Sequence, residues 1–106
     1  MPRLLVEKGP DRGKSVTVAV GAQLIAGRDK EAGLQLSDTM ASRRHFMIAS
    51  KSGIFGLKDL NSANGTLVNG RQSEGAHRLQ YGDSIQVGET LMSWLADETG
   101  DKQGGL

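Results

Sequence analysis

The sequence predicts an all-β fold built as a sandwich of short strands. Short runs of apolar and β-branched residues recur along the chain at roughly regular spacing, with turn residues between them. The chain has 15 glycines among 106 residues, about twice the average usage of roughly 7%. No segment keeps an apolar stripe at helical spacing over several turns. These observations together favour many strands joined by tight turns.

In the first half of the chain, alternating or β-branched residues mark the strand candidates. They are Leu4–Val6, Ser15–Val20, Leu24–Arg28, Leu34–Leu36 and His45–Ser50. The segment 8–13 between the first two candidates carries Gly, Pro and Asp in turn order, so it predicts a hairpin connection.

The second half continues the same pattern up to residue 95. Its strand candidates are Ile54–Leu60, Gly65–Val68, Ser84–Val87 and Thr90–Leu95. Asn-Gly at 69–70 is a strong hairpin signal, and 51–53 reads as a tight hairpin loop. From residue 97 the chain is polar and glycine-rich, so we expect a domain over 1–97 and a flexible tail or linker over 98–106.

The composition limits the classes of partner. Lys and Arg number 13 against 12 Asp and Glu, which gives a formal net charge of +1. This balance supplies no global field for nucleic acid or an anionic membrane, so any anion site must be local. There is no cysteine, which excludes disulfides and thiolate metal sites. The N-terminus has the pattern of neither a signal peptide nor a membrane span, so we expect a cytoplasmic protein. We also expect a monomer.

Two enzymatic alternatives are poorly supported. The segment Gly9–Ser15 resembles a nucleotide-binding P-loop, but it has one residue too few between its glycines and precedes a strand instead of a helix. Ser42, His45 and Asp38 lie close in sequence, yet no nucleophile-elbow glycines flank the serine. Two distant histidines without clustered carboxylates form no metal-ligand set. We therefore expect a binding module without catalytic residues, metal or cofactor.

Four short pieces with phosphate- and peptide-binding chemistry occur in a fixed order, each at a strand end or in a loop. They are Gly27-Arg28, Ser42-Arg43-Arg44-His45, residues 61–66 (Asn-Ser-Ala-Asn-Gly-Thr) and Val68-Asn69-Gly70. An arginine offers a planar fork for phosphate oxygens, a serine offers a hydroxyl donor, and an asparagine suits a peptide backbone.

This ordered set resembles the signature of the forkhead-associated (FHA) family, and the similarity covers roughly residues 4–95. The resemblance implies an eleven-stranded β-sandwich that presents loops at one edge to a phosphothreonine peptide. It implies that Arg28 and Ser42 contact the phosphate and that Arg43 adds a phosphate or backbone contact. It also implies that Asn64 holds the peptide main chain.

The same resemblance implies supporting roles for further residues. The residues expected to shape the loops are Gly27, His45, Ser62, Gly65, Thr66 and Asn69. Family members often carry Thr or a longer polar residue where this chain has Ala63, so one phosphate contact is missing here. Met40 suggests tolerance for an apolar residue in the bound peptide.

The resemblance implies a phosphothreonine-dependent binding module in kinase-linked regulation, with a Thr-phosphorylated protein or peptide bound in cis or in trans. An FHA-like scaffold that binds partners independently of phosphate is the alternative, and Ala63 is the residue that points to it.

Overall fold

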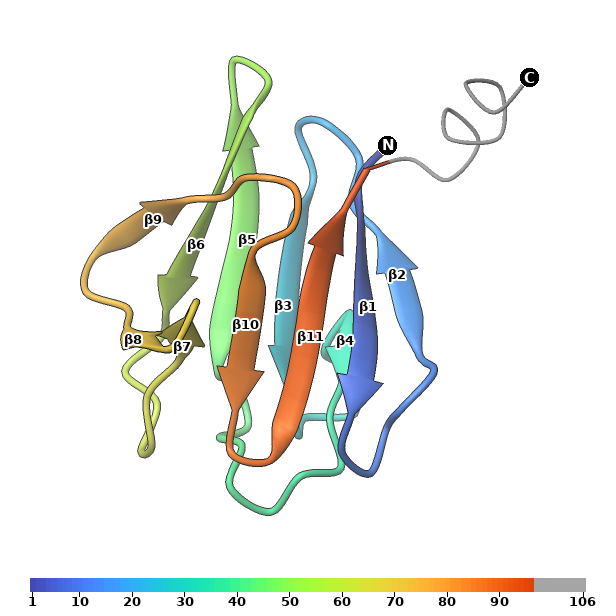
Figure 1. Cartoon of the computed structure of the whole chain (residues 1–106), viewed down its shortest axis with the longest axis vertical. Helices are drawn as coiled ribbons and strands as arrows, with labels where there is room; N and C mark the ends of the chain where they lie inside the picture. The colour runs from blue at the N-terminus through green and yellow to red at the C-terminus, as the bar shows by residue number, and fades with distance from the viewer. Residues whose placement is uncertain (97–106) are drawn as a thin grey trace.

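The computed structural model describes residues 1–96, which fold into two β-sheets without a helix among those residues (Figure 1). The strands are β1 (Arg3–Lys8), β2 (Ser15–Thr17), β3 (Gln23–Gly27), β4 (Leu34–Gln35), β5 (Phe46–Lys51), β6 (Ile54–Asp59), β7 (Leu67–Val68), β8 (Arg71–Gln72), β9 (Ala76–Arg78), β10 (Ser84–Val87) and β11 (Thr90–Leu95). The all-β prediction and the eleven strands implied by the resemblance are confirmed. The expected tail over 98–106 lies outside the described residues.

The two sheets have different strand orders. One sheet runs β2-β1-β11-β10-β7-β8, and the other runs β4-β3-β5-β6-β9. All neighbouring strands pair antiparallel except β3 and β4, which pair parallel. β1 and β11, from opposite ends of the described chain, lie side by side in the first sheet, so this pairing closes the domain (Figure 1).

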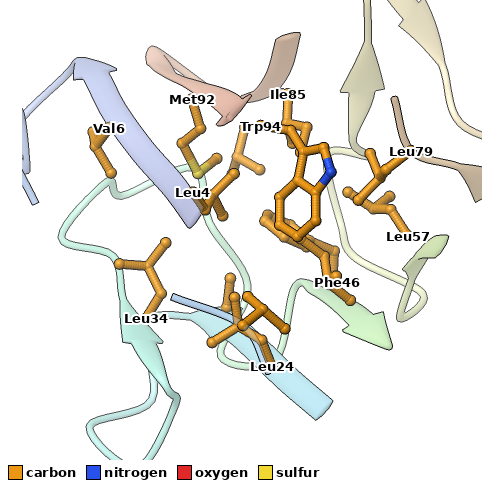
Figure 2. Packing of buried hydrophobic residues seen from close by; sticks show 14 of the residues in the cluster. Leu4, Val6, Leu24, Leu34, Phe46, Leu57, Leu79, Ile85, Met92 and Trp94 are labelled. Atoms are coloured by element: carbon orange, nitrogen blue, oxygen red, sulfur yellow. The ribbon is translucent and has the colours of Figure 1, made fainter. Parts of the chain in front are cut away.

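The core lies between the two sheets and follows from the alternation of side chains along each strand. Met92 and Trp94 on β11 face Phe46 and Leu57 on the opposite sheet, and all four are at most 1% exposed (Figure 2). The ring centroids of Phe55 and Trp94 lie 5.3 Å apart in a tilted arrangement, within the range that aromatic pairs prefer. Apolar contacts therefore hold the sheets together.

The predicted strand positions agree with the structure except in four places. The strand expected over Ser15–Val20 ends at Thr17, because its partner β1 begins at Arg3, which pairs with Thr17, and Val20 is 67% exposed. The strand expected over Gly65–Val68 begins only at Leu67, because Gly65 has a φ of 80° and the Thr66 hydroxyl donates to Asp59 in the preceding loop. The sequence pattern does not predict β8 and β9, since they carry no large apolar side chain and are exposed apart from the half-buried His77.

Two predicted hairpin turns have the backbone conformation that such turns need. Asn69 and Gly70 have φ angles of 53° and 84°, and Ser52 and Gly53 have φ angles of 54° and 79°. Positive φ at both central residues matches the twist of the flanking strands, which explains the Asn-Gly preference. The segment predicted to join β1 to β2 also forms an antiparallel hairpin connection.

Three loops gather at one end of the sandwich, at the bottom of Figure 1. They are the β3–β4 loop (28–33), the β4–β5 loop (36–45) and the β6–β7 loop (60–66). We call these three loops the loop rim. No helix within residues 1–96 is long and apolar enough to cross a membrane.

Candidate functional site

Arg28 and Ser42 meet at the loop rim. The N–H of Arg28 donates to the Ser42 carbonyl at 3.0 Å, and its side-chain Nε donates to the Ala41 carbonyl at 2.6 Å. The Asp29 N–H donates to the Arg43 carbonyl at 3.1 Å. These bonds join the β3–β4 loop to the β4–β5 loop and fix the Arg28 side chain along Ala41. Arg28 and Arg43 are exposed, and the terminal nitrogens of both guanidinium groups bond to no other residue within 1–96.

Gly27 makes this close approach possible. A Cβ at this position would overlap the Arg43 carbonyl oxygen and would lie 2.6 Å from the carbonyl carbon. It would also lie 2.8 Å from the Ser42 carbonyl oxygen. Backbone contact between two loops therefore leaves no room for a side chain at Gly27.

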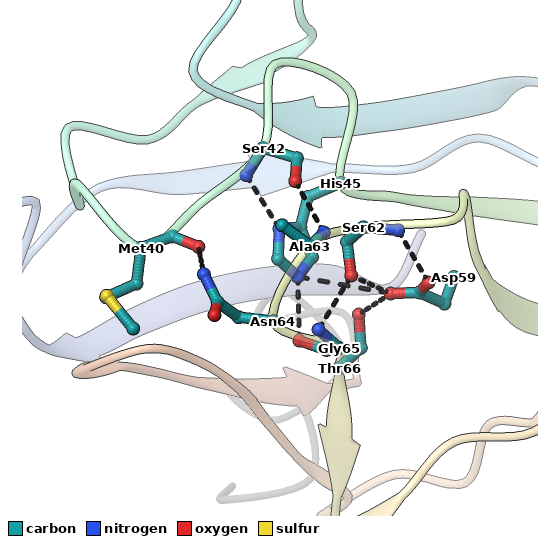
Figure 3. A network of polar contacts seen from close by, with 9 residues as sticks. All are labelled: Met40, Ser42, His45, Asp59, Ser62, Ala63, Asn64, Gly65 and Thr66. Atoms are coloured by element: carbon teal, nitrogen blue, oxygen red, sulfur yellow. Dashed lines mark hydrogen bonds and ion pairs between the residues drawn. The ribbon is translucent and has the colours of Figure 1, made fainter.

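Ser42 also connects to the third loop of the rim. Its hydroxyl oxygen accepts the Ala63 N–H at 3.0 Å, and its own N–H donates to His45 Nδ1 at 2.9 Å (Figure 3). The hydroxyl hydrogen donates to no other described residue, so it is available to a ligand oxygen.

His45 holds two loops together from inside the domain. The ring is fully buried, and its Nε2 donates to the Gly65 carbonyl at 2.8 Å (Figure 3). Because Nδ1 accepts the Ser42 N–H and a carbonyl can only accept, the proton lies on Nε2 of a neutral ring. His45 therefore fixes the distance between the β4–β5 and β6–β7 loops.

Asp59, at the end of β6, organises the β6–β7 loop. Its Oδ2 accepts the Ser62 N–H at 2.9 Å, and its Oδ1 accepts the hydroxyls of Ser62 at 2.6 Å and Thr66 at 2.7 Å. The Gly65 N–H donates to the Ser62 hydroxyl at 2.9 Å. Burial alone would raise the pKa of Asp59, but the hydrogen bonds that it accepts from Ser62 and Thr66 lower it below its ordinary value.

Asn64 and Met40 lie against each other on the exposed side of the rim. The Asn64 side-chain amide donates to the Met40 carbonyl at 2.8 Å (Figure 3). The Oδ1 atom of Asn64 bonds to no other described residue and is free for a peptide N–H. The Met40 side chain is 45% exposed, so it presents an apolar surface beside the asparagine.

Two further aspartates anchor the β4–β5 loop. Asp38 is 4% exposed and accepts the N–H groups of Met40 and Glu89 at 2.9 Å and the Thr90 hydroxyl at 2.8 Å. Asp11 accepts the Ser37 N–H at 2.6 Å and its hydroxyl at 2.9 Å. Burial alone would raise the pKa of both aspartates, but the hydrogen bonds that they accept lower it.

The sequence alone does not mark these three carboxylates as supports of the site. In the sequence, Asp11 lies in a predicted turn, Asp38 lies near Ser42 and His45, and Asp59 falls within a predicted strand. The Asp-x-x-Ser spacing of 59 and 62 is the one local signal for such an anchor, since an aspartate at a turn often accepts bonds from residues that follow it.

Asn69 lies away from the rim. Its side-chain amide donates to Asp83 at 3.0 Å, and its Oδ1 accepts the Ser84 N–H at 2.9 Å. Asn69 thus shapes the β7–β8 turn against the start of β10, while Thr66 at the other side of β7 bonds to Asp59. The structure brings together the other expected site residues but not Asn69.

The arrangement suits an anion better than a nucleophilic reaction. The Ser42 hydroxyl does not bond to His45, whose Nδ1 is occupied by a backbone N–H, and Asp38 bonds elsewhere. Ser42, His45 and Asp38 therefore do not form a triad. Within residues 1–96, no group of three or more His, Asp or Glu side chains could hold a metal ion.

Comparisons with known proteins identify similar sequences and folds. A model of the FHA domain matches residues 24–88. The oxoglutarate dehydrogenase inhibitor of Corynebacterium glutamicum is 37% identical over 93 residues, which cover 88% of this chain and 64% of that protein. The glycogen accumulation regulator GarA of Mycobacterium tuberculosis is 35% identical over 101 residues, which cover 95% of this chain and 59% of that protein. The chain thus spans less than two thirds of either relative.

A solved structure agrees at the level of the fold. It belongs to a study of phosphothreonine-dependent FHA domain interactions and superposes with a TM-score of 0.81. Its sequence is 32% identical, and the match covers 91% of this chain and 96% of that chain.

Proposed function

This chain belongs to the FHA domain family, whose members bind phosphothreonine peptides, and we propose that Arg28, Ser42 and Arg43 form its phosphate site. The observation that carries the proposal is the meeting of Arg28 and Ser42. They are 14 positions apart (42 − 28), yet the Arg28 N–H donates to the Ser42 carbonyl. The free guanidinium nitrogens of Arg28 and the free hydroxyl of Ser42 then converge on one ligand.

A phosphorylated threonine carries about −1.5 to −2 charge and three strong acceptor oxygens at neutral pH. Arg28 supplies a planar fork for two of these oxygens, Ser42 supplies a hydroxyl donor, and the exposed Arg43 supplies a second cation. The three loops of the rim are already held in place by the backbone bonds of Arg28 and Asp29, by His45 and by Asp59. Binding therefore needs little rearrangement, and most of the affinity depends on the phosphate.

The peptide main chain lies against Asn64 and Met40 in this proposal. Asn64 Oδ1 accepts a peptide N–H, and the half-exposed Met40 side chain contacts an apolar residue of the peptide. A preference for threonine over serine follows from burial of the γ-methyl group, which is worth on the order of 0.8 kcal/mol.

Replacement of the proposed phosphate ligands tests this function. We expect Arg28→Ala and Ser42→Ala each to weaken binding of a phosphothreonine peptide about ten- to a hundredfold, because each removes a charge-assisted hydrogen bond. The exposed residues Arg71 and Ser15 provide matched controls, and their alanine variants should bind as the parent does. Titration calorimetry measures affinity, and thermal melts confirm that each variant folds. Parent-like affinity of both folded variants would refute the site.

The second candidate function is an FHA-like scaffold that binds its partner without phosphate, and Ala63 favours it because this side chain supplies no donor. Equal affinity for phosphorylated and unmodified peptide would support that alternative. In either case we infer a monomeric cytoplasmic protein, and its regulatory role is supported by the two named relatives, an inhibitor and a regulator. Under the first candidate function its partner is a Thr-phosphorylated segment, bound in cis or in trans.

A further inference from the structure

The outer face of β5, β6 and β9 carries small residues at its centre. On β6, Phe55 and Leu57 are buried, so Gly56 between them faces outward. Cross-strand pairing places Gly56 between Ala49 on β5 and Arg78 on β9. The neighbouring outward-facing pairs on this face are Lys51 with Ile54 and Lys58 with Ala76.

The small side chains leave a depression in this face. Its volume is about 540 Å³, and its lining includes Ala49, Lys51, Ile54, Gly56, Ala76 and Arg78. The depression is shallow and wide open to solvent, so it suits an extended segment of a partner and not an enclosed small molecule. The Ile54 side chain is 47% exposed at the edge of the depression, so the surface offers apolar contact that the domain itself does not use.

Gly56 is not required by the fold. Every other glycine within residues 1–96 either has a positive φ or would place a Cβ within 3.0 Å of another atom. At Gly56 the φ is ordinary for a strand, and the nearest atom to an added Cβ is the His77 carbonyl oxygen at 3.5 Å, which is normal contact. Glycine weakens a strand interior and often marks a place where another molecule's backbone approaches closely.

The Lys and Arg residues that line the depression are cationic, and no carboxylate within residues 1–96 lines it. Lys51 and Arg78 line it, and the exposed Lys58 lies next to it on β6. His77 reaches to the other side of β9, where its Nε2 lies 3.2 Å from Asp83. Among the described lining residues there is no Asp or Glu. Two copies of this face would repel each other, whereas an acidic segment would be complementary.

We propose that this face is a second docking surface, which binds an acidic segment of a protein partner and seats one apolar side chain over Gly56. The carboxylates of that segment pair with Lys51, Lys58 and Arg78. The β5–β6 hairpin extends to the opposite end of the sandwich from the loop rim (Figure 1), so the surface does not use Arg28 or Ser42. The proposed docking surface and the proposed phosphate site therefore share no residue.

Nuclear magnetic resonance titration with defined peptides tests the proposed docking surface. The probe is a capped, unphosphorylated peptide with the core Glu-Asp-Leu-Asp-Glu, and the matched peptides replace its leucine with glycine or its acids with lysines. We expect saturable amide shifts over 49–56 and 76–78 with the probe, at least fivefold weaker binding of the glycine peptide, and no saturation with the lysine peptide. No saturable shifts at this face up to millimolar probe, or equal binding of the lysine peptide, would overturn the proposal.

Variants separate this surface from the phosphate site. Gly56→Val fills the depression, and Lys51→Glu and Arg78→Glu reverse its charge, so each should weaken probe binding at least tenfold. Arg12→Glu, an exposed reversal on the β1–β2 turn, should change it less than twofold. Gly56→Val should keep its affinity for a phosphothreonine peptide, which confirms that the variant folds. If Arg12→Glu and Arg78→Glu lost probe binding equally, the loss would come only from the changed net charge of the domain. That result would refute the proposed docking surface.

Discussion

Gly27 and Gly56 lie in the same sheet but meet different physical demands. At Gly27 a Cβ would overlap the backbone of the β4–β5 loop, whereas at Gly56 it would make ordinary contact. We expect Gly27→Ala to destabilise the domain by about 1–3 kcal/mol, because the two loops must move apart. Gly56→Ala should stabilise it by about 0.5–1 kcal/mol, since alanine has less backbone freedom to lose.

Urea unfolding of both variants measures these differences, and phosphopeptide titration shows whether the loops have moved. Gly27→Ala should also weaken peptide binding, because Arg28 follows directly on the displaced residue. Equal stability of the two alanine variants would show that the close approach at Gly27 has no energetic weight.

Ala63 offers a gain-of-affinity test at the same scale. Its N–H already donates to the Ser42 hydroxyl, so a side chain at this position lies beside the proposed phosphate site. We expect Ala63→Thr to strengthen phosphopeptide binding about tenfold, because a charge-assisted hydrogen bond contributes roughly 1.5–3 kcal/mol. Ala63→Val is the matched control, since valine has the shape of threonine without the hydroxyl. Titration measures both affinities. Equal affinities of Ala63→Thr and Ala63→Val would contradict the proposed position of the phosphate.

At the scale of an element, the β6–β7 loop depends on one carboxylate. Asp59 uses both oxygens to accept three hydrogen bonds from Ser62 and Thr66. We expect Asp59→Asn to cost about 1–2 kcal/mol and to weaken phosphopeptide binding, because an amide nitrogen cannot accept the bonds made by one of those oxygens. Amide resonances over 62–65 should shift or broaden.

Asp83→Asn is the matched control for this loop. Asp83 also accepts several hydrogen bonds, from Asn69, Gln80 and His77, but it lies at the start of β10. Its replacement should lower stability by a similar amount and leave peptide affinity unchanged. Loss of affinity in both variants would mean that global stability, and not the loop, controls binding.

The elements that the sequence could predict are those with an apolar signal. Alternation identified long strands such as β5, β6 and β11, because their buried side chains repeat at every second residue. β8 and β9 have no such pattern, since they are short strands held by pairing with β7 and β6. The positions of β8 and β9 are therefore set by hydrogen bonding to β7 and β6 and not by a pattern in their own residues.

The same distinction holds for the candidate site. Arg28, Ser42 and Asn64 could be proposed as candidates from the sequence, because their motifs follow one another along the chain in the order typical of the family. Asp59 and Asp11 could not be identified as loop anchors, because a single aspartate near a turn looks the same whether it faces solvent or accepts three bonds. Its role depends on which loop folds over it, and only the three-dimensional structure determines this.

At the scale of the whole molecule, folding and binding should respond to different ranges of pH. The hydrogen bonds accepted by Asp11, Asp38, Asp59 and Asp83 outweigh the effect of burial and lower the pKa of each below the ordinary value of 3.8. A carboxylate whose pKa is lower in the folded state stabilises the fold above the unfolded value of 3.8. This contribution is lost as the pH falls through the lowered folded value.

The phosphate of the ligand changes charge in a higher range, since its second ionisation has a pKa of about 6. We therefore expect affinity for a phosphothreonine peptide to fall between pH 7 and pH 5 while the urea midpoint of the free domain stays nearly constant. The midpoint should fall only below about pH 4, as the four aspartates become protonated. Paired titration and urea experiments in the same buffers measure both quantities. If the urea midpoint and the affinity fell together between pH 7 and pH 5, unfolding would explain the loss of binding, and the charge of the phosphate would not.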